Sequence, residues 1–265
     1  MKTCIVVGAQ GFIGSAFAAE AEARGYALTA VDLDNYAEFR GTEADLLVNA
    51  AGNSRKFIDD QDPVRGYELS VTSVMNVLHD FRCGLYVQLS TGAIYPHEND
   101  PRRNGEDAPL PPAEMTRYGF HKWLAEQLVR HYAPRHLILR MGGFVGPHLR
   151  KNAVYDLLAG KPLFVHPDSE FQIMDTRDLA RAVFGLCEGP SLPVALLNFS
   201  SRGAVSVRQI AAWAGVELPP NADRLPRVRA ELNVERAARL LALPETAATL
   251  RAFIQEVRSG RLVLP

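Results

Sequence analysis

The sequence is poor in cysteine, in net charge and in long hydrophobic runs, and each shortage excludes a class of protein. Its 265 residues include 3 widely spaced cysteines and no C-x-x-C pair, which excludes a disulfide scaffold and a cysteine zinc site. We therefore expect reduced thiols and no bound metal. A formal net charge of −1 leaves no electrostatic footprint for a nucleic acid. The longest apolar runs fall far below the ~20 residues of a membrane helix, so we expect a cytoplasmic protein without a membrane partner.

The remaining composition is that of an ordinary globular protein. Hydrophobic residues make up 47% of the chain and charged residues 22%. A chain of this length buries roughly 70–75% of its unfolded surface, so its core needs no disulfide or metal for stability. Function must therefore be sought in motifs rather than in composition.

Strand-like and helix-like segments alternate over the first 147 residues. Short apolar runs predict strands at 3–7, 26–31, 45–50, 84–90 and 136–141. Longer patterns predict helices at 13–24, 64–82 and 116–132. This alternation is typical of βαβ units, so we predict an α/β fold with a Rossmann-type, doubly wound parallel sheet.

The pattern changes after residue 147. Helical patterns cover 151–160, 176–188, 206–214 and 231–257, with few short strands between them. We predict a dinucleotide-binding domain over 1–147 and a small, mostly helical substrate-binding part over 148–265, with the chain crossing back to the sheet near 172–200. We expect the second part to cap the C-terminal edge of the sheet, where open α/β folds bind ligands.

A glycine-rich loop follows the first predicted strand. Gly8, Gly11 and Gly14 form the pattern G-x-x-G-x-x-G, with Phe12 and Ile13 before the last glycine. Such glycines allow a tight turn and a close approach to a pyrophosphate, and the following helix N-terminus supplies free N–H groups. The motif alone is weak evidence, because a glycine-rich turn can also be purely structural.

An acidic residue at the end of the second predicted strand supports the ligand-binding interpretation. A carboxylate at the position of Asp32 accepts hydrogen bonds from the adenosine ribose and repels a 2′-phosphate. The alternative is a solvated turn residue, since Asp34 and Asn35 follow. The loop and the acid together predict a bound dinucleotide, NAD in preference to NADP.

A tyrosine and a lysine are spaced for one face of a helix. Tyr118 and Lys122 are four residues apart, and a neighbouring cation stabilises a phenolate. Such a tyrosine can exchange a proton with a substrate hydroxyl or carbonyl. The pattern Y-x-x-x-K is common and usually marks only a helix face. It gains weight from Thr91, which places a hydroxyl at the ligand edge of a strand, although that hydroxyl could also cap a turn.

These motifs together resemble the extended short-chain dehydrogenase/reductase family, of the nucleotide-sugar epimerase/dehydratase type. The resemblance covers residues 1 to about 150 and rests on the order and spacing of its motifs. They are the glycine loop with Asp32, Asn49-Ala50-Ala51-Gly52, Ser90-Thr91-x-x-Ile94-Tyr95, Tyr118-x-x-x-Lys122, and Leu139-Arg140 to Val145-Gly146-Pro147. A weaker match continues through 175–180, 206–210 and the last helix.

The resemblance implies roles for these residues. Thr91 would hydrogen-bond the reacting oxygen, Tyr118 would be the acid/base, and Lys122 would bind the nicotinamide ribose and lower the pKa of the tyrosine. The implied cofactor contacts are Gly8, Gly11, Phe12, Ile13, Gly14, Asp32, Ala50, Ala51, Gly52, Tyr118, Lys122, Met141 and Gly142. The helices at 64–82 and 116–132 often form a dimer interface in this family, so a homodimer is implied as well.

The sequence also departs from the family pattern. Only residues 33–44 separate Asp32 from the next strand, where the family has a helix and a strand, so we expect a sheet with one strand fewer. Ser70 and Gly143 stand where asparagines near the cofactor and the substrate pyrophosphate are usual, and the usual arginine near 170–172 is absent. Recognition of a diphosphate is weakened by these losses. Other candidate ligands for a sugar nucleotide are Arg55, Lys56, Arg150, Lys151 and Asn152, and a smaller, less charged substrate is the alternative.

The residues after Thr91 narrow the reaction. Gly92 and Ala93 stand where dehydratases and decarboxylating members carry carboxylates. This leaves 4-epimerisation through a transient keto intermediate, or net reduction or oxidation, at a hydroxyl or keto carbon of a sugar or nucleotide sugar. The short chain and the missing phosphate ligands favour the reductase slightly.

The sequence leaves two further alternatives open, which are additional acid/base histidines and a protein that binds a cofactor without catalysis. His97 and His121 are candidate acid/base groups, although His121 is turned off the helix face of Tyr118, which favours a packing role. A non-catalytic NAD(P)-binding sensor is the competing class. The intact Thr91, Tyr118 and Lys122 argue against it, because a sensor needs no tuned acid/base.

Overall fold

The chain forms two compact units, each built from separate stretches of sequence. The computed structural model describes residues 1–189, 192 and 194–265. The first unit comprises Met1–Pro96, Glu106–Met141 and Ala180–Leu197, and the second comprises His97–Gly105, Gly142–Leu179 and Asn198–Pro265. The chain therefore passes repeatedly from one unit to the other.

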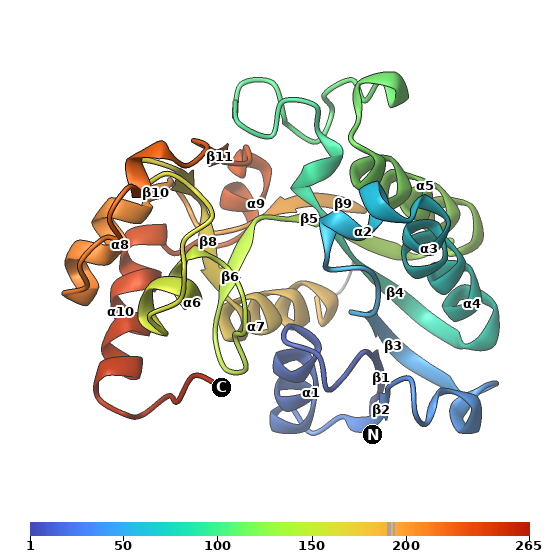
Figure 1. The fold of residues 1–265 in the computed structure, drawn as a ribbon. Coiled ribbons are helices and arrows are strands. Elements are labelled where there is room, and N and C mark those ends of the chain that lie inside the picture. Colours follow the sequence, from blue (N-terminus) through green and yellow to red (C-terminus); the bar gives the residue numbers. More distant parts are fainter. Residues whose placement is uncertain (190–191, 193) are drawn as a thin grey trace. The chain divides into compact units, whose positions relative to one another are not determined.

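A six-stranded sheet with the order β2-β1-β3-β4-β5-β9 dominates the first unit (Figure 1). Its strands are β1 (Thr3–Val7), β2 (Ala27–Val31), β3 (Glu43–Asn49), β4 (Arg82–Thr91), β5 (His136–Met141) and β9 (Leu196–Phe199). The four pairings from β2 to β5 are parallel. Because β1 lies between β2 and β3, the strand order reverses there, and the predicted doubly wound α/β fold is confirmed.

Helices connect these strands, and one predicted helix is divided. The helices are α1 (Gly14–Ala23), α2 (Lys56–Gln61), α3 (Pro63–Tyr67), α4 (Ser73–Asp80), α5 (Arg117–Tyr132) and α7 (Thr176–Cys187), with short 3₁₀ turns at Gly92–Ile94 and Pro112–Glu114. The helix predicted over 64–82 has a π-helical segment, Glu68–Thr72, between α3 and α4. Such segments are rare and frequently lie at functional sites.

The short connection between β2 and β3 holds no strand. Residues 32–42, all of which the structure describes, form turns and a 3₁₀ helix, Tyr36–Phe39. Tyr36 and Phe39 pack against the buried core. The sheet therefore ends at β2 on this side, as the trimmed sequence led us to expect.

The core of the first unit follows from the apolar strands, which alternate little because both faces of the sheet are covered. Ile5, Leu47 and Ile138 from the strands meet Val77 of α4 and Val129 of α5 in one buried cluster. This packing holds α5 against the sheet, and α5 carries the predicted tyrosine and lysine.

The second unit has two small sheets and four helices in its described residues. One sheet pairs β6 (Gly143–Val145) with β8 (Ile173–Asp175), and the other has the order β10-β7-β11. The remaining elements are β7 (Glu170–Phe171), β10 (Val205–Ser206), β11 (Arg229–Ala230), α6 (Ala153–Leu158), α8 (Val207–Ala214), a 3₁₀ turn (Ala222–Arg224), α9 (Glu235–Leu240) and α10 (Thr246–Arg258).

The single helix predicted over 231–257 was wrong. The structure has α9 and α10 instead, separated by residues 241–245, and no helix over 231–234. Pro244 explains the break, because proline lacks an N–H and clashes with the preceding turn of a helix.

Within the described residues, no helix is long and apolar enough to cross a membrane, and no group of three or more His, Cys, Asp or Glu residues could hold a metal. The three cysteines are free thiols. Burial raises the pKa of Cys4 to about 12 and that of Cys83 to about 11, so neither is a reactive thiolate at neutral pH.

Candidate active site

The glycine loop between β1 and α1 folds into a cradle that only glycine permits at two positions. Gly8 has φ +81°, and the N–H of Gly11 donates to its carbonyl oxygen at 3.0 Å. A Cβ on Gly14 would collide with that same carbonyl, and a Cβ on Gly8 would press against the backbone of Ala50 and Ala51 at 3.0–3.2 Å. The glycine loop and the segment that follows β3, both predicted as cofactor contacts, are therefore in close backbone contact.

Asp32 holds this loop from the end of β2. Its carboxylate oxygens accept the backbone N–H of Gln10 at 3.1 and 3.2 Å, and the Asn35 side chain accepts the N–H of Asp32 at 2.7 Å. Partial burial raises the pKa of Asp32, and the hydrogen bond from Gln10 opposes that rise. Asp32 is thus tied to the glycine loop rather than lying free in a solvated turn.

Lys122 lies beside the backbone that follows β3. A Cβ on Gly52, which has φ +137°, would lie 3.9 Å from the Nζ of Lys122. Lys122 is 6% exposed, and its Nζ donates to the carbonyl oxygen of Leu89 in β4 at 3.1 Å. Burial lowers the pKa of Lys122 to about 8, while the nearby carboxylates of Glu126 and Asp59 act in the opposite direction.

The first turn of α5 packs closely against the turn that follows Thr91. Thr91 ends β4, pairs with Met141 of β5, and accepts the N–H of Ala93 on its Oγ1 at 3.2 Å. Thr116 caps α5 by accepting the N–H of Gly119 at 3.1 Å. A Cβ on Gly119 would clash with the carbonyl oxygen of Ala93, so this glycine lets the first turn of α5 approach the turn after Thr91.

The hydroxyl of Tyr118 has a backbone partner in the segment after β3. Tyr118 is 8% exposed, and its Oη donates to the carbonyl oxygen of Asn53 at 3.3 Å. The Nζ of Lys56 lies 5.9 Å from the centroid of the Tyr118 ring. The structure therefore gathers Thr91, Tyr118 and Lys122 in one unit, together with Asn53, which the sequence did not single out.

A buried ion pair ties α5 to the sheet behind these residues. Arg140 of β5 donates to both oxygens of Glu126 at 2.8–3.2 Å and to the Oη of Tyr95 at 2.9 Å. Ser90 donates to Glu126 at 2.6 Å. Glu126 was missed by the sequence analysis. Its signal was its place one helical turn after Lys122, on the same face of α5.

Ser70 leaves a buried hydroxyl without a hydrogen-bond partner among the described residues. Ser70 is 1% exposed and lies in the π-helical segment. The carbonyl of Leu69, the preceding residue, lies near Gly52. Buried polar groups are nearly always paired, so this atom is suited to a ligand or a water. The glycine cradle, Asp32, the buried Lys122 and this hydroxyl fit a dinucleotide.

Met141 and Gly142 stand at the point where the chain leaves the first unit. Met141 is 7% exposed at the end of β5. Within the second unit, a Cβ on Gly142 would lie 2.8 Å from the Oγ of Ser200, and the N–H of Gly143 donates to Gln172 at 3.0 Å. Gly143 pairs with Ile173 of β8, and as a glycine it offers no side chain to a substrate at this position.

Asn152, a candidate phosphate ligand in the second unit, uses its side chain within the fold. Asn152, with φ +142°, caps α6 by accepting the N–H of Tyr155 at 2.9 Å and donates to the carbonyl of Phe144 at 2.8 Å. His97, which was a candidate acid/base group, also belongs to this unit. Its backbone carbonyl accepts the Nδ2–H of Asn104 at 3.1 Å.

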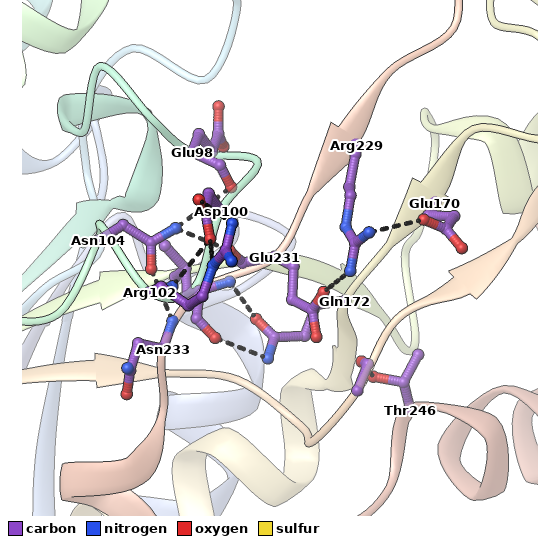
Figure 2. Close-up of polar contacts among 12 residues, drawn as sticks. Glu98, Asp100, Arg102, Asn104, Glu170, Gln172, Arg229, Glu231, Asn233 and Thr246 are labelled. Carbon is purple, nitrogen blue, oxygen red and sulfur yellow. Dashed lines mark hydrogen bonds and ion pairs between the residues drawn. The ribbon is translucent and has the colours of Figure 1, made fainter.

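Asn104 anchors the inserted segment His97–Gly105 within the second unit, as Figure 2 shows. Its side chain is fully buried, donates to the carbonyl of Glu231 at 2.8 Å and accepts the N–H of Asn233 at 2.8 Å. Gln172 exchanges two hydrogen bonds with the backbone of Leu232 at 3.0 and 3.2 Å. A hollow of about 390 Å³ beside these residues is lined by polar side chains such as Arg102, Arg202 and Glu245.

The fold and the site define a nicotinamide-dependent enzyme of the short-chain dehydrogenase/reductase type, in which a glycine loop and an acid after β2 accompany a strand-end threonine and a helical Tyr–Lys pair. The chain belongs to the NAD dependent epimerase/dehydratase family, whose model matches residues 4–191. No functionally curated protein matches it.

Solved structures of similar fold include enzymes that act on nucleotide sugars. A dTDP-4-dehydrorhamnose reductase from Bacillus anthracis in complex with NADP is 16% identical, with 96% of this chain and 98% of that one covered and a TM-score of 0.77. A UDP-galactose 4-epimerase is 21% identical, with 97% and 99% covered and a TM-score of 0.76. A UDP-glucuronic acid 4-epimerase from Bacillus cereus in complex with UDP-glucuronic acid and NAD is 16% identical, with 97% and 99% covered and a TM-score of 0.76.

Proposed function

We propose that this protein transfers a hydride between a nicotinamide cofactor and a sugar carbon that bears a hydroxyl or keto group, with the sugar linked to a nucleotide. The observation that carries the proposal is the packing of the first turn of α5 against the turn after β4. This packing supports a site that uses the Thr91 hydroxyl, the Tyr118 phenol and the Lys122 ammonium group, because Lys122 also donates to Leu89, two residues before Thr91 in β4. We propose that residues 1–147 hold the cofactor and 148–265 contribute to substrate recognition.

The chain's own residues would manage the proton. The bound cofactor supplies or accepts the hydride. Tyr118 exchanges a proton between its Oη and the substrate oxygen, which takes the place of the Asn53 carbonyl as hydrogen-bond partner. Thr91 accepts the N–H of Ala93, which leaves its own O–H available to donate to the substrate oxygen. Lys122, positively charged below its pKa of about 8, favours the phenolate.

We propose NAD as the cofactor in preference to NADP. Asp32 places a carboxylate directly behind the glycine loop, where it accepts ribose hydroxyls and repels a 2′-phosphate. The similar solved structures include complexes with NAD and with NADP, so the family admits both. The proposed cofactor contacts are Gly8, Gly11, Phe12, Ile13, Gly14, Asp32, Ala50, Ala51, Gly52, Tyr118, Lys122, Met141 and Gly142.

Reduction and 4-epimerisation remain the two candidate reactions, and cofactor handling separates them. An epimerase returns its NAD to the starting state and interconverts two sugars without net oxidation of added NADH. A reductase consumes one NADH for each sugar reduced. The small number of phosphate ligands in this chain favours the reductase.

The test combines cofactor titration with turnover. We expect the purified protein to bind NADH more tightly than NADPH in a fluorescence titration. In an assay with nucleotide sugars such as UDP-glucose and UDP-glucuronic acid, followed by product analysis, Tyr118→Phe should lower turnover at least about a hundredfold while the NADH affinity stays within about threefold. Binding of neither cofactor, or a fully active Tyr118→Phe variant, would contradict the proposal. Binding without turnover of any sugar substrate would favour the sensor.

We also propose a homodimer whose interface is formed by α2 and α3, which follow β3, and by α5. Phe57, Val64 and Tyr67 on α2 and α3 and Tyr132 on α5 are large apolar side chains that remain 43–71% exposed within the chain. Val64, Tyr67 and Tyr132 lie in the segments 64–82 and 116–132, from which the sequence resemblance implies a dimer, whereas Phe57 of α2 lies outside them. Burial of such side chains in an interface removes apolar surface from water.

A further inference from the structure

A carboxylate and an imidazole are buried together one helical turn from the proposed acid/base. Asp59 of α2 is fully buried, and its Oδ1 lies 2.7 Å from the Nδ1 of His121 in α5. His121 is 8% exposed, and the ring of Tyr67 stands edge-on to its imidazole at a centroid distance of 5.6 Å. Asp59 was not singled out from the sequence, and a packing role was favoured for His121.

This pair is connected to Tyr118 through Asn53. The second oxygen of Asp59 accepts the Nδ2 of Asn53 at 2.5 Å, and the Oδ1 of Asn53 accepts the N–H of Arg55 at 2.8 Å. Both ends of the Asn53 amide are therefore held. The backbone carbonyl of the same residue accepts the hydroxyl of Tyr118 at 3.3 Å. The contacts run from His121 through Asp59 and Asn53 to the reacting phenol, all within the first unit.

The surrounding backbone is shaped to admit the carboxylate. A Cβ on Gly66 of α3 would lie 2.6 Å from the Oδ1 of Asp59, so a glycine is needed where α3 passes it. Burial of two ionisable side chains seldom adds net stability relative to apolar side chains of similar size, because both lose their hydration. A pair kept at this place is more readily explained by the geometry that it imposes than by the stability that it adds.

We propose that Asp59 and His121 are positioning residues for Tyr118. Their contact fastens the segment 53–59 to α5, so that the Asn53 carbonyl accepts the Tyr118 hydroxyl and holds the phenol in one orientation before the substrate oxygen replaces that carbonyl. The inference rests on the proposed acid/base role of Tyr118. It adds two residues that do not touch the substrate but determine where the phenol points.

The test reads the surroundings of Tyr118 directly. The chain contains 8 tyrosines, so protein labelled with ¹³C at the ζ carbon of tyrosine gives few signals, and the one lost in Tyr118→Phe identifies Tyr118. Asp59→Ala and His121→Ala remove one side of the pair and should move or broaden this signal. Asp59→Asn should leave it in place, because its amide oxygen can accept from Asn53 while its NH₂ group donates to the other tautomer of His121. This rescue separates a positional role from an effect of the Asp59 charge.

A matched carboxylate elsewhere in the same unit provides the control. Asp80 accepts the hydroxyl of Tyr36 at 3.0 Å, so Asp80→Ala should move the Tyr36 signal and leave that of Tyr118 unchanged. With any nucleotide sugar that the wild-type protein turns over, Asp59→Ala should lower kcat about tenfold or more with KM changed less than about threefold. Asp59→Asn should stay within about threefold of the wild type.

The outcomes separate this inference from the proposed function. Folded Asp59→Ala and His121→Ala variants with an unmoved Tyr118 signal would overturn the positioning role, whatever the protein's activity. If Asp59→Ala does not fold, His121→Ala and Asp59→Asn decide in the same way. The Tyr118 signal is measured without cofactor or substrate, so it does not depend on the proposed function. Failure of the proposed function would appear separately, as wild-type protein that binds neither NADH nor NADPH.

Discussion

Lys122 shows how a single residue's surroundings can couple stability to pH. Its ammonium group donates to the carbonyl of Leu89 and lies beside the backbone that follows β3, and its side chain is 6% exposed. The charged form is therefore disfavoured by burial, and the carboxylates of Glu126 and Asp59 offset this only in part. A partly desolvated cation of this kind interacts strongly with a nearby phenol, because little water screens it.

The same burial predicts a rise in stability at alkaline pH. The pKa of Lys122 is about 8 in the folded chain and about 10.5 when unfolded, so between these values the unfolded state binds more protons. The cost of burying the charge is present in full below pH 8 and is relieved as the pH rises towards 10.5. We expect the free energy of unfolding of the wild type to gain up to about 3 kcal/mol over this range relative to Lys122→Met, measured by urea unfolding. Parallel profiles for the two proteins would contradict the assignment.

At the scale of elements, the placement of α5 depends on a glycine in its first turn. Gly119 lies against the carbonyl of Ala93, and a side chain at this position would push α5 away from the turn that follows Thr91. The buried pair of Glu126 and Arg140 then fixes the middle of the helix against β5. The helix that carries the proposed acid/base is thus held by contacts at two positions, its first turn and its middle.

Two glycine substitutions should therefore change stability in opposite directions. Gly119→Ala should destabilise the chain by about 1–3 kcal/mol, because the added methyl group overpacks the contact with Ala93. Gly185→Ala in α7 should stabilise it by about 0.5–1 kcal/mol, since nothing lies within 4 Å of the new Cβ and alanine is the better helix former. Thermal and urea unfolding of both variants measure the difference. Equal effects of the two substitutions would show that α5 does not need the close approach.

The elements themselves were largely predictable from the sequence, and the exceptions have physical causes. The strands β1 to β5 were predicted because doubly covered parallel strands are continuous apolar runs. The break between α9 and α10 was missed although Pro244 marks it. Glu126 was missed because a charged residue in a helical pattern is normally solvated, and its partner Arg140 lies in another element. Asp59 was missed because no helix was predicted over 56–61 and its partner His121 is 62 residues away. Only the fold brings such charges together.

At the scale of the whole molecule, large apolar side chains remain exposed on the neighbouring helices α2, α3 and α5. Large apolar side chains scattered singly on a surface are ordinary, but several on neighbouring helices mark an association surface. Val64 is 71% exposed in α3 and has no role in the contacts around Tyr118.

We expect the wild-type protein to sediment as a dimer at micromolar concentration and Val64→Glu to sediment as a monomer or with its dimer affinity weakened at least about tenfold, because a charge would be buried in the interface. Leu33→Glu is the control, since Leu33 is fully exposed on the loop after β2 and outside these helices. A wild-type monomer, or equal behaviour of the two variants, would contradict the proposed interface.

The interleaving of the two units also limits how the protein can be divided in the laboratory. A truncation after residue 147 would delete β9, which is an edge strand of the six-stranded sheet. It would also leave the segment 97–105 without its partners, because the buried Asn104 forms hydrogen bonds with Glu231 and Asn233. Neither unit is a contiguous cassette, so recombination with a relative's substrate-binding part at one crossover point would cut both units. Swaps in this chain must exchange several segments at once.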